Sequence, residues 1–212
     1  MKTKSFKYWK SQEIDTIFNL SNLKNLPLLD NWLDNKITPS DQENLKIKEL
    51  QKIISDLDVN LLTEIELIMK IIGPILNIVK LKGQGYDYFA GRQIGATIGN
   101  FKLNGFVDGV IASGRYEPIA PYFFLHEYKK EQGFEADPRG QLLAEMLAAQ
   151  AINSNGKPIY GCYVIGRNWF FCVLSGKEYS FSLAYDCTKP EIFDIFRILK
   201  GFKHILETEI LI

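Results

Sequence analysis

The feature that most constrains the fold is a run of short apolar segments, cut by glycines, in the middle of the chain. Eight of the 16 glycines lie within residues 83–114, among aromatic and β-branched side chains. Apolar pieces of this length between glycines are typical of strands with tight turns and bulges. We therefore expect strands at 86–98 and 103–113, followed by a third, rich in aromatic residues, at 122–130.

Helical signals flank these strands on both sides. Asp137-Pro138 predicts a helix start, with the aspartate as N-cap and the proline in the first turn, and apolar residues continue this helix to about residue 153. The complete predicted order is a helix at 60–81, the three strands, the 138–153 helix, strands at 160–165 and 169–174, an edge strand at 179–185 and a last helix at 190–207. This order predicts an α/β fold with a mixed central sheet flanked by helices.

Residues 1–57 differ in composition from the middle of the chain, because they are rich in polar side chains and read as helical. The segment Pro39-Ser40-Asp41-Gln42-Glu43 is a capping box behind a proline, and apolar residues recur after it at helical spacing. We see no chemically active motif in this region. We therefore expect a helical N-terminal extension at 1–57 and a single domain at 58–212.

Composition narrows the function classes. Lys plus Arg and Asp plus Glu both total 25, and a net charge of zero speaks against holding nucleic acid by bulk positive charge. Three cysteines cannot form a disulfide framework, which favours reduced thiols in a cytoplasmic protein. The longest apolar run, Ile65 to Leu81, is too short and too charged for a bilayer, so no membrane partner is expected. Two histidines without partners at metal spacing argue against zinc.

One candidate site lies on the third predicted strand. Glu127 and Lys129 are two residues apart, so their side chains point to the same face of a strand. His126 and Tyr128 point to the opposite face and are expected to pack in the core. The pair alone is also explained by a solvated ion pair, because Asp34-Asn35-Lys36 repeats its spacing in a polar helical region.

The preceding strand adds a second acid. Asp108 is the only charged residue in an apolar strand, where a carboxylate is costly unless a cation or a donor meets it. If the two strands pair, Asp108 and Glu127 can lie side by side. Two close carboxylates repel one another, and a divalent cation resolves the conflict. Mg²⁺ suits such a site because it usually takes one or two carboxylates and keeps several waters.

These residues carry a resemblance to a known family. Asp108, then Glu127-Tyr128-Lys129, then a helix that opens Asp137-Pro-Arg-Gly-Gln141, resemble the PD-(D/E)XK nuclease superfamily. Upstream, Asn60-Leu-Leu-Thr-Glu64-Ile-Glu66, followed by Pro74-Ile-Leu, resembles the start of the nuclease module of type I restriction enzyme R subunits.

The resemblance spans residues 60–175 and leaves the 1–57 segment outside. It departs from the family pattern at Val107, where a proline often precedes the metal-binding acid. The resemblance implies a restriction endonuclease-like αβββαβ core. It also implies a Mg²⁺-dependent endonuclease, with Mn²⁺ as a substitute, which hydrolyses phosphodiester bonds, with DNA as the expected substrate in restriction, defence or repair.

The resemblance also implies a role for each site residue. Asp108 and Glu127 hold the metal, together with the backbone carbonyl of Tyr128. Lys129 orients a water or stabilises negative charge, and Gln141 holds the water or the substrate backbone.

The helix at 60–81 adds a further acid to the implied metal site. Glu64 is the expected carboxylate, with Glu66 as the alternate. A capping box begun by Thr63 explains these early acids equally well.

Two other functions stay open from the sequence. The chain is a catalytically inactive nuclease-fold protein that acts in nucleic-acid binding or assembly, or it is an unrelated α/β protein in which Glu127 and Lys129 form a structural pair. Sequence specificity is expected to come from the 1–57 segment, from loops, or from a homodimer or partner protein.

Overall fold

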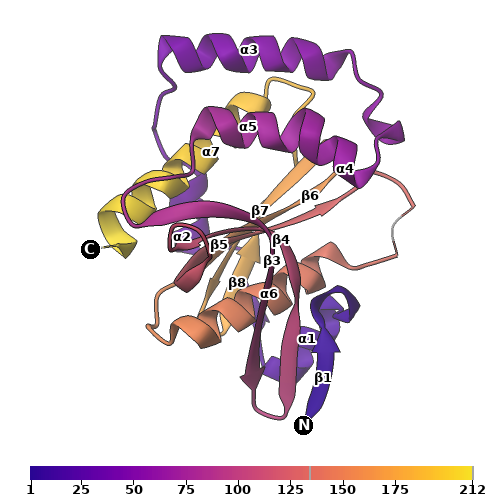
Figure 1. Ribbon diagram of the computed structural model, residues 1–212, viewed down its shortest axis with the longest axis vertical. Helices are drawn as coiled ribbons and strands as arrows, with labels where there is room; N and C mark the ends of the chain where they lie inside the picture. Colours follow the sequence, from indigo (N-terminus) through magenta and orange to yellow (C-terminus); the bar gives the residue numbers. More distant parts are fainter. Residues whose placement is uncertain (134, 212) are drawn as a thin grey trace.

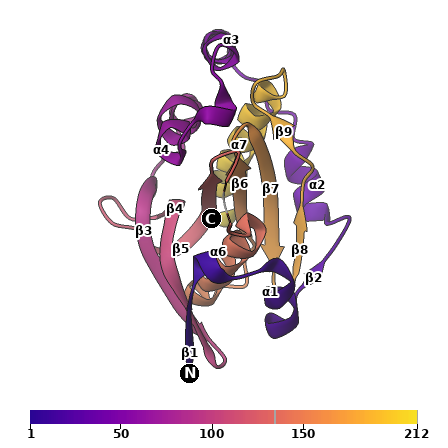
Figure 2. The same ribbon diagram turned by 90° about the vertical axis from the view of Figure 1, so that its right-hand side faces the viewer.

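The computed structural model describes residues 1–133 and 135–211 (Figure 1). A mixed sheet of nine strands forms its centre, with helices on both faces (Figure 2). The strands are β1 (Lys2–Ser5), β2 (Ser21–Asn22), β3 (Tyr86–Ile98), β4 (Phe101–Ser113), β5 (Ile119–Lys129), β6 (Ile159–Ile165), β7 (Asn168–Ser175), β8 (Glu178–Phe181) and β9 (Tyr185–Asp186). The predicted α/β class with a mixed central sheet is confirmed.

The α-helices are α1 (Ser11–Phe18), α2 (Pro27–Leu33), α3 (Asp41–Ser55), α4 (Glu64–Leu67), α5 (Gly73–Val79), α6 (Pro138–Asn153) and α7 (Ile192–Ile205). One buried core on one face of the sheet receives side chains from α2, α3, α5 and α7, and a second core on the other face receives them from α1 and α6. Among the described residues, no helix combines the length and the apolar character needed to cross a membrane.

The three strands of the middle region, β3, β4 and β5, are neighbours in the sheet. The order is β1-β4-β5-β6-β7-β8-β2, with β3 paired to β4 and β9 paired to β7. Pairs β1–β4, β5–β6 and β2–β8 are parallel, and the others are antiparallel. The predicted strands at 86–98, 103–113 and 122–130 correspond to β3, β4 and β5, and the helix predicted at 138–153 is α6.

The helix predicted at 60–81 is less regular than its apolar pattern indicates. A 3-10 turn at Val59–Leu61 precedes α4, and a π-helical segment at Ile68–Ile72 joins α4 to α5. Pro74 has no N–H to donate to the preceding turn, so the regular hydrogen-bond ladder cannot continue through it. A π-helical turn is a common way to accommodate such an interruption.

Residues 1–57 are built into the fold. Besides helices, this segment supplies β1, which pairs with β4, and β2, which pairs with β8. Trp9 and Trp32 are fully buried and lie in different cores. The indole N–H of Trp32 donates to the carbonyl of Ile198, 2.8 Å away. Residues 1–57 therefore contribute strands to the same sheet and side chains to the same two cores as the rest of the chain.

Gly140 allows a test of how closely the N-terminal segment packs against α6. A Cβ at this position, in the first turn of α6, would lie 2.6 Å from both Ser11 N and Trp9 O. We expect Gly140→Ala to lower the free energy of unfolding by about 1–2 kcal/mol, because backbone atoms cannot make room cheaply. Helix propensity alone predicts the opposite sign, so a stabilised variant in urea denaturation would contradict close packing of the N-terminal segment.

Candidate functional site

The candidate site lies where the sheet divides along one edge of β4. β3 pairs along the whole of β4, so β1 and β5 share the other edge. β1 pairs with residues 101–104 of β4, and β5 pairs with residues 109–113. Asp108 falls in the gap between these two ladders. Its Oδ2 accepts a hydrogen bond of 2.7 Å from the backbone N–H of Tyr128. The side chain thus replaces a strand carbonyl and holds Asp108 against the end of β5.

Glu127 and Lys129 occupy the face of β5 that the alternation of the strand predicts. The Glu127 carboxylate is fully buried, and only 14% of the Lys129 side chain is exposed. Lys129 Nζ forms an ion pair with Glu127 Oε1 and donates to the Tyr128 carbonyl at 3.1 Å. Glu64 Oε2, from the first turn of α4, lies 4.0 Å from the same ammonium. Three of the oxygens expected to hold a metal therefore surround the Lys129 ammonium.

α6 contributes two polar side chains behind Glu127. Gln141 Nε2 donates to Glu127 Oε2 at 2.6 Å, which places the predicted glutamine in the site. The same amide lies 3.3 Å from Glu145 Oε1, one turn further along α6. Glu145 is fully buried, and sequence reasoning missed it. Its signal was present, because Glu145 is the only charge in the apolar run from Leu142 to Ala151 and lies four residues after Gln141.

Glu64 and Glu66 point to different partners. Thr63 caps α4, and its N–H and hydroxyl both bond to Glu66 Oε2, at 3.0 and 2.9 Å. Glu66 Oε1 also accepts from Lys70 at 2.9 Å. The Thr63 backbone N–H, followed by Lys70, lowers the pKa of Glu66. Glu66 is thus engaged in helix capping, whereas Glu64 faces Lys129.

Burial dominates the electrostatics of the acids in the site. Burial raises the pKa of Asp108, although the Tyr128 N–H and Lys129 oppose the shift. Burial and then repulsion from Asp108 raise the pKa of Glu127, so these two carboxyls are close enough to interact. Glu145 has a pKa well above its ordinary value, because of burial and then repulsion from Glu127. Burial also raises the pKa of Glu64. Attraction to Lys129 opposes this shift, and repulsion from Asp108 adds to it.

Lys129 balances part of this negative charge. Burial alone would lower the pKa of the Lys129 ammonium, but Glu127, with further help from Asp108 and Glu64, raises it above its ordinary value. Lys129 is therefore a firmly protonated cation among acids that resist ionisation. A divalent cation near the same oxygens would stabilise their charged forms further.

The opposite face of β5 is core, as the sequence predicts. Tyr128 is buried, and its hydroxyl lies 3.3 Å from that of Tyr88 on β3. His126 is fully buried, and its Nδ1 lies 3.3 Å from Cys162 Sγ. Burial lowers the pKa of His126 to about 3, so this imidazole is neutral at ordinary pH.

The donors of the site suit a hard cation, but they are not arranged as a finished metal centre. Within residues 1–133 and 135–211, no group of three or more His, Cys, Asp or Glu side chains could hold a metal ion. Carboxylate and carbonyl oxygens are the donors that Mg²⁺ prefers. Here the Lys129 ammonium lies against the oxygens of Glu127 and Tyr128. A metal at these oxygens therefore requires the Lys129 side chain to turn away.

Comparison with known proteins does not assign this site. No protein-family model matches the chain, and no curated protein matches it either.

Proposed function

We propose that the protein is a metal-dependent nuclease with a restriction endonuclease-like core, which hydrolyses phosphodiester bonds in DNA. The observation that carries the proposal is the convergence of Asp108, Glu127 and Lys129 where β4 and β5 separate, with Gln141 on the second oxygen of Glu127. The order α4–α5, β3, β4, β5, α6 and β6 agrees with an αβββαβ core.

The residues of the site suggest how such a reaction would be supported. Asp108 and Glu127 would hold Mg²⁺ or Mn²⁺, together with the Tyr128 carbonyl and Glu64. The metal would polarise a phosphoryl oxygen and lower the pKa of a bound water. Lys129, released from Glu127, would place its ammonium beside the negative charge that develops on the phosphate. The Gln141 amide keeps the Glu127 carboxylate in one orientation.

A second function has an observation in its favour. Lys129 pairs directly with the buried Glu127, so this carboxylate already has a cationic partner within the protein. A catalytically inactive protein that uses the same fold for nucleic-acid binding or assembly would keep this pair for its structural value.

A cleavage assay separates the two functions. Supercoiled plasmid, duplex and single-stranded DNA, and RNA are incubated with the full chain in Mg²⁺, in Mn²⁺ and in EDTA. We expect cleavage in the metal-containing samples only. Lys129→Ala should lose this cleavage. Lys36→Ala is its matched control, because Asp34 and Lys36 repeat the spacing of Glu127 and Lys129 on the surface, where both side chains are about 80% exposed. No cleavage of any substrate in either metal would overturn the nuclease proposal and favour the binding function.

A further inference from the structure

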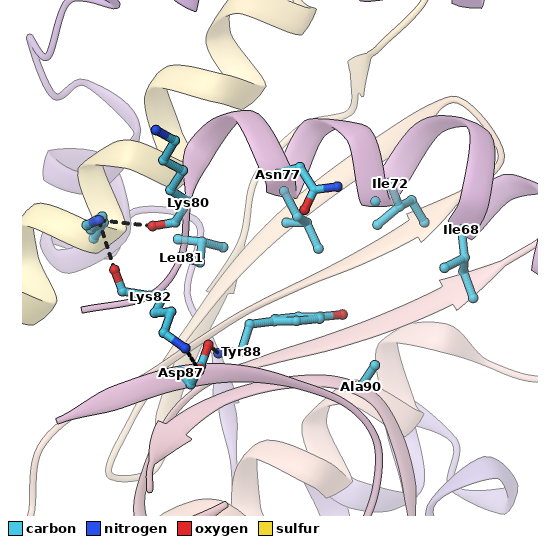
Figure 3. Close-up of a pocket in the computed structure, with 12 residues that line it drawn as sticks. Ile68, Ile72, Asn77, Lys80, Leu81, Lys82, Asp87, Tyr88 and Ala90 are labelled. Carbon is cyan, nitrogen blue, oxygen red and sulfur yellow. Dashed lines mark hydrogen bonds and ion pairs between the residues drawn. The ribbon is translucent and has the colours of Figure 1, made fainter. Parts of the chain in front are cut away.

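A cavity of about 610 Å³ lies between the α4–α5 helical segment and β3 (Figure 3). This volume is within the range of small-molecule sites. Ile68, Ile72 and Leu76 line it from the helical side, and Tyr88 and Ala90 line it from β3. Its walls are mostly apolar, and its polar groups gather at one end.

The Tyr88 ring forms the floor of this cavity. In Figure 3 the ring lies flat in the space between the helix and β3, with its hydroxyl directed toward the Ile68 end. That hydroxyl is 3.3 Å from the Tyr128 hydroxyl. It also lies over Gly109, the residue after Asp108, where an added Cβ would come within 2.3 Å of the Tyr88 oxygen. The floor of the cavity therefore contacts β4 and β5 on the sheet face opposite to Glu127 and Lys129.

The helical wall of the cavity also leads toward the candidate site. Ile68 follows Glu64 by four residues, about one helical turn, and Glu64 faces Lys129. Glu64 thus joins the helical wall of this cavity to Lys129 at the end of β5.

The opposite end carries charged side chains of both signs. Lys80, Lys82, Lys203 and Asp87 line it, and the Lys80 ammonium is directed away from the cavity in Figure 3. Lys82 and Asp87 form an ion pair, and Lys203 donates to the carbonyls of Lys80 and Lys82 at 2.9 and 3.1 Å. Lys203 also lies 4.0 Å from Glu207. The exposed amide of Asn77, between the two ends, can donate and accept hydrogen bonds.

We propose that this cavity binds one unpaired nucleobase of the nucleic-acid strand whose phosphodiester lies at the candidate site. This inference rests on the proposed function and specifies its substrate as single-stranded or locally unpaired. A flat ring between apolar walls can stack on Tyr88, and such stacking tolerates any base because every base has a π-face. The Asn77 amide would bond to polar atoms of the base, and Lys82, whose side chain is largely exposed, would exchange Asp87 for a phosphate that flanks the base. A base held in a duplex cannot enter.

Binding is measured separately from cleavage, by fluorescence anisotropy of a labelled single-stranded oligonucleotide in Ca²⁺. We expect Tyr88→Leu to weaken binding by about 5- to 150-fold, the range for the loss of one stacked base. Tyr88→Phe is the matched control, because it keeps the ring and removes only the contact with Tyr128. Its affinity should stay within about twofold of wild type, since stacking on the ring is retained.

A second variant tests the same cavity in case Tyr88→Leu disturbs the fold. Ala90 is exposed at the cavity, so Ala90→Trp can fill the space with little change to the core. It should weaken single-stranded binding as Tyr88→Leu does, with unchanged thermal unfolding. A 5-iodouracil placed in the oligonucleotide should crosslink to Tyr88 on irradiation.

The outcomes separate this inference from the proposed function. Equal single-stranded binding by wild type, Tyr88→Leu and Ala90→Trp would overturn the nucleobase site, and metal-dependent cleavage by all three would leave the nuclease standing. If Tyr88→Leu and Ala90→Trp both weaken binding while the wild type cleaves no substrate, the nucleobase site is supported and the nuclease proposal is overturned. Duplex bound as tightly as single strand, with the same dependence on both residues, would contradict the requirement for an unpaired base.

Discussion

Lys129→Met is expected to remove most of the metal-dependent cleavage and to lower the free energy of unfolding by about 3–5 kcal/mol at pH 9, which is the usual cost of breaking a buried ion pair from one side. Glu127 is fully buried, and Lys129 is its ion-pair partner. Methionine preserves the length of the side chain and removes the charge. Cleavage should fall at least about 100-fold, because loss of one charge-stabilising group in a nuclease-like site has an effect of this order.

The stability cost of this variant should depend on pH. Burial and then Asp108 raise the pKa of Glu127, so its carboxyl takes up a proton in the folded state at a pH where the unfolded chain is still ionised. At pH 5 the protonated Glu127 needs no cation, and the cost of Lys129→Met should shrink. Urea denaturation of wild type and variant at pH 5 and pH 9 measures the difference.

A double variant separates structure from catalysis. Glu127→Gln with Lys129→Met removes both charges and should recover most of the lost stability, while cleavage stays low. Lys36→Met, in the exposed pair with the same spacing, should change neither quantity, because surface ion pairs contribute little. Full cleavage by Lys129→Met would show that the observed activity comes from another protein in the preparation.

Local patterns explain why much of the fold could be predicted. The glycine-cut apolar runs indicated β3, β4 and β5, and Asp137-Pro138 indicated the start of α6, because each signal is contained in a few consecutive residues. The same strands carry Asp108, Glu127 and Lys129. Their alternation and pairing therefore predicted which side chains would share a face.

The parts that escaped prediction depend on contacts distant in sequence. β1 has the sequence Lys-Thr-Lys-Ser, with no apolar alternation, and it is a strand because its backbone pairs with β4 about 100 residues away. Trp32 is buried by partners such as Phe202, which no local pattern connects to it. The ammonium of Lys129 among the proposed metal donors is likewise a property of packed side chains and not of spacing.

Glu145→Gln is expected to raise the free energy of unfolding at pH 8 by at least about 2 kcal/mol, because the folded protein no longer has to keep a buried acid protonated at a pH where the unfolded chain ionises it. Glu145 is fully buried, and its Oε2 has no hydrogen-bond partner among the described residues. Burial, followed by Glu127, holds its pKa far above the ordinary value.

The sign of the pH dependence follows from that shift. The stability that Glu145 contributes is complete below the pKa of the unfolded carboxyl and is lost as the pH rises from there toward its raised folded value. Glutamine does not titrate, so the gain from Glu145→Gln should be small at pH 4 and large at pH 8. Glu66→Gln is the control of opposite sign, because capping contacts lower the pKa of Glu66 and its charged form stabilises the fold above pH 5. Urea denaturation across this range should therefore move the two variants in opposite directions, and a loss of stability in Glu145→Gln at pH 8 would mean that the fold requires the carboxylate itself.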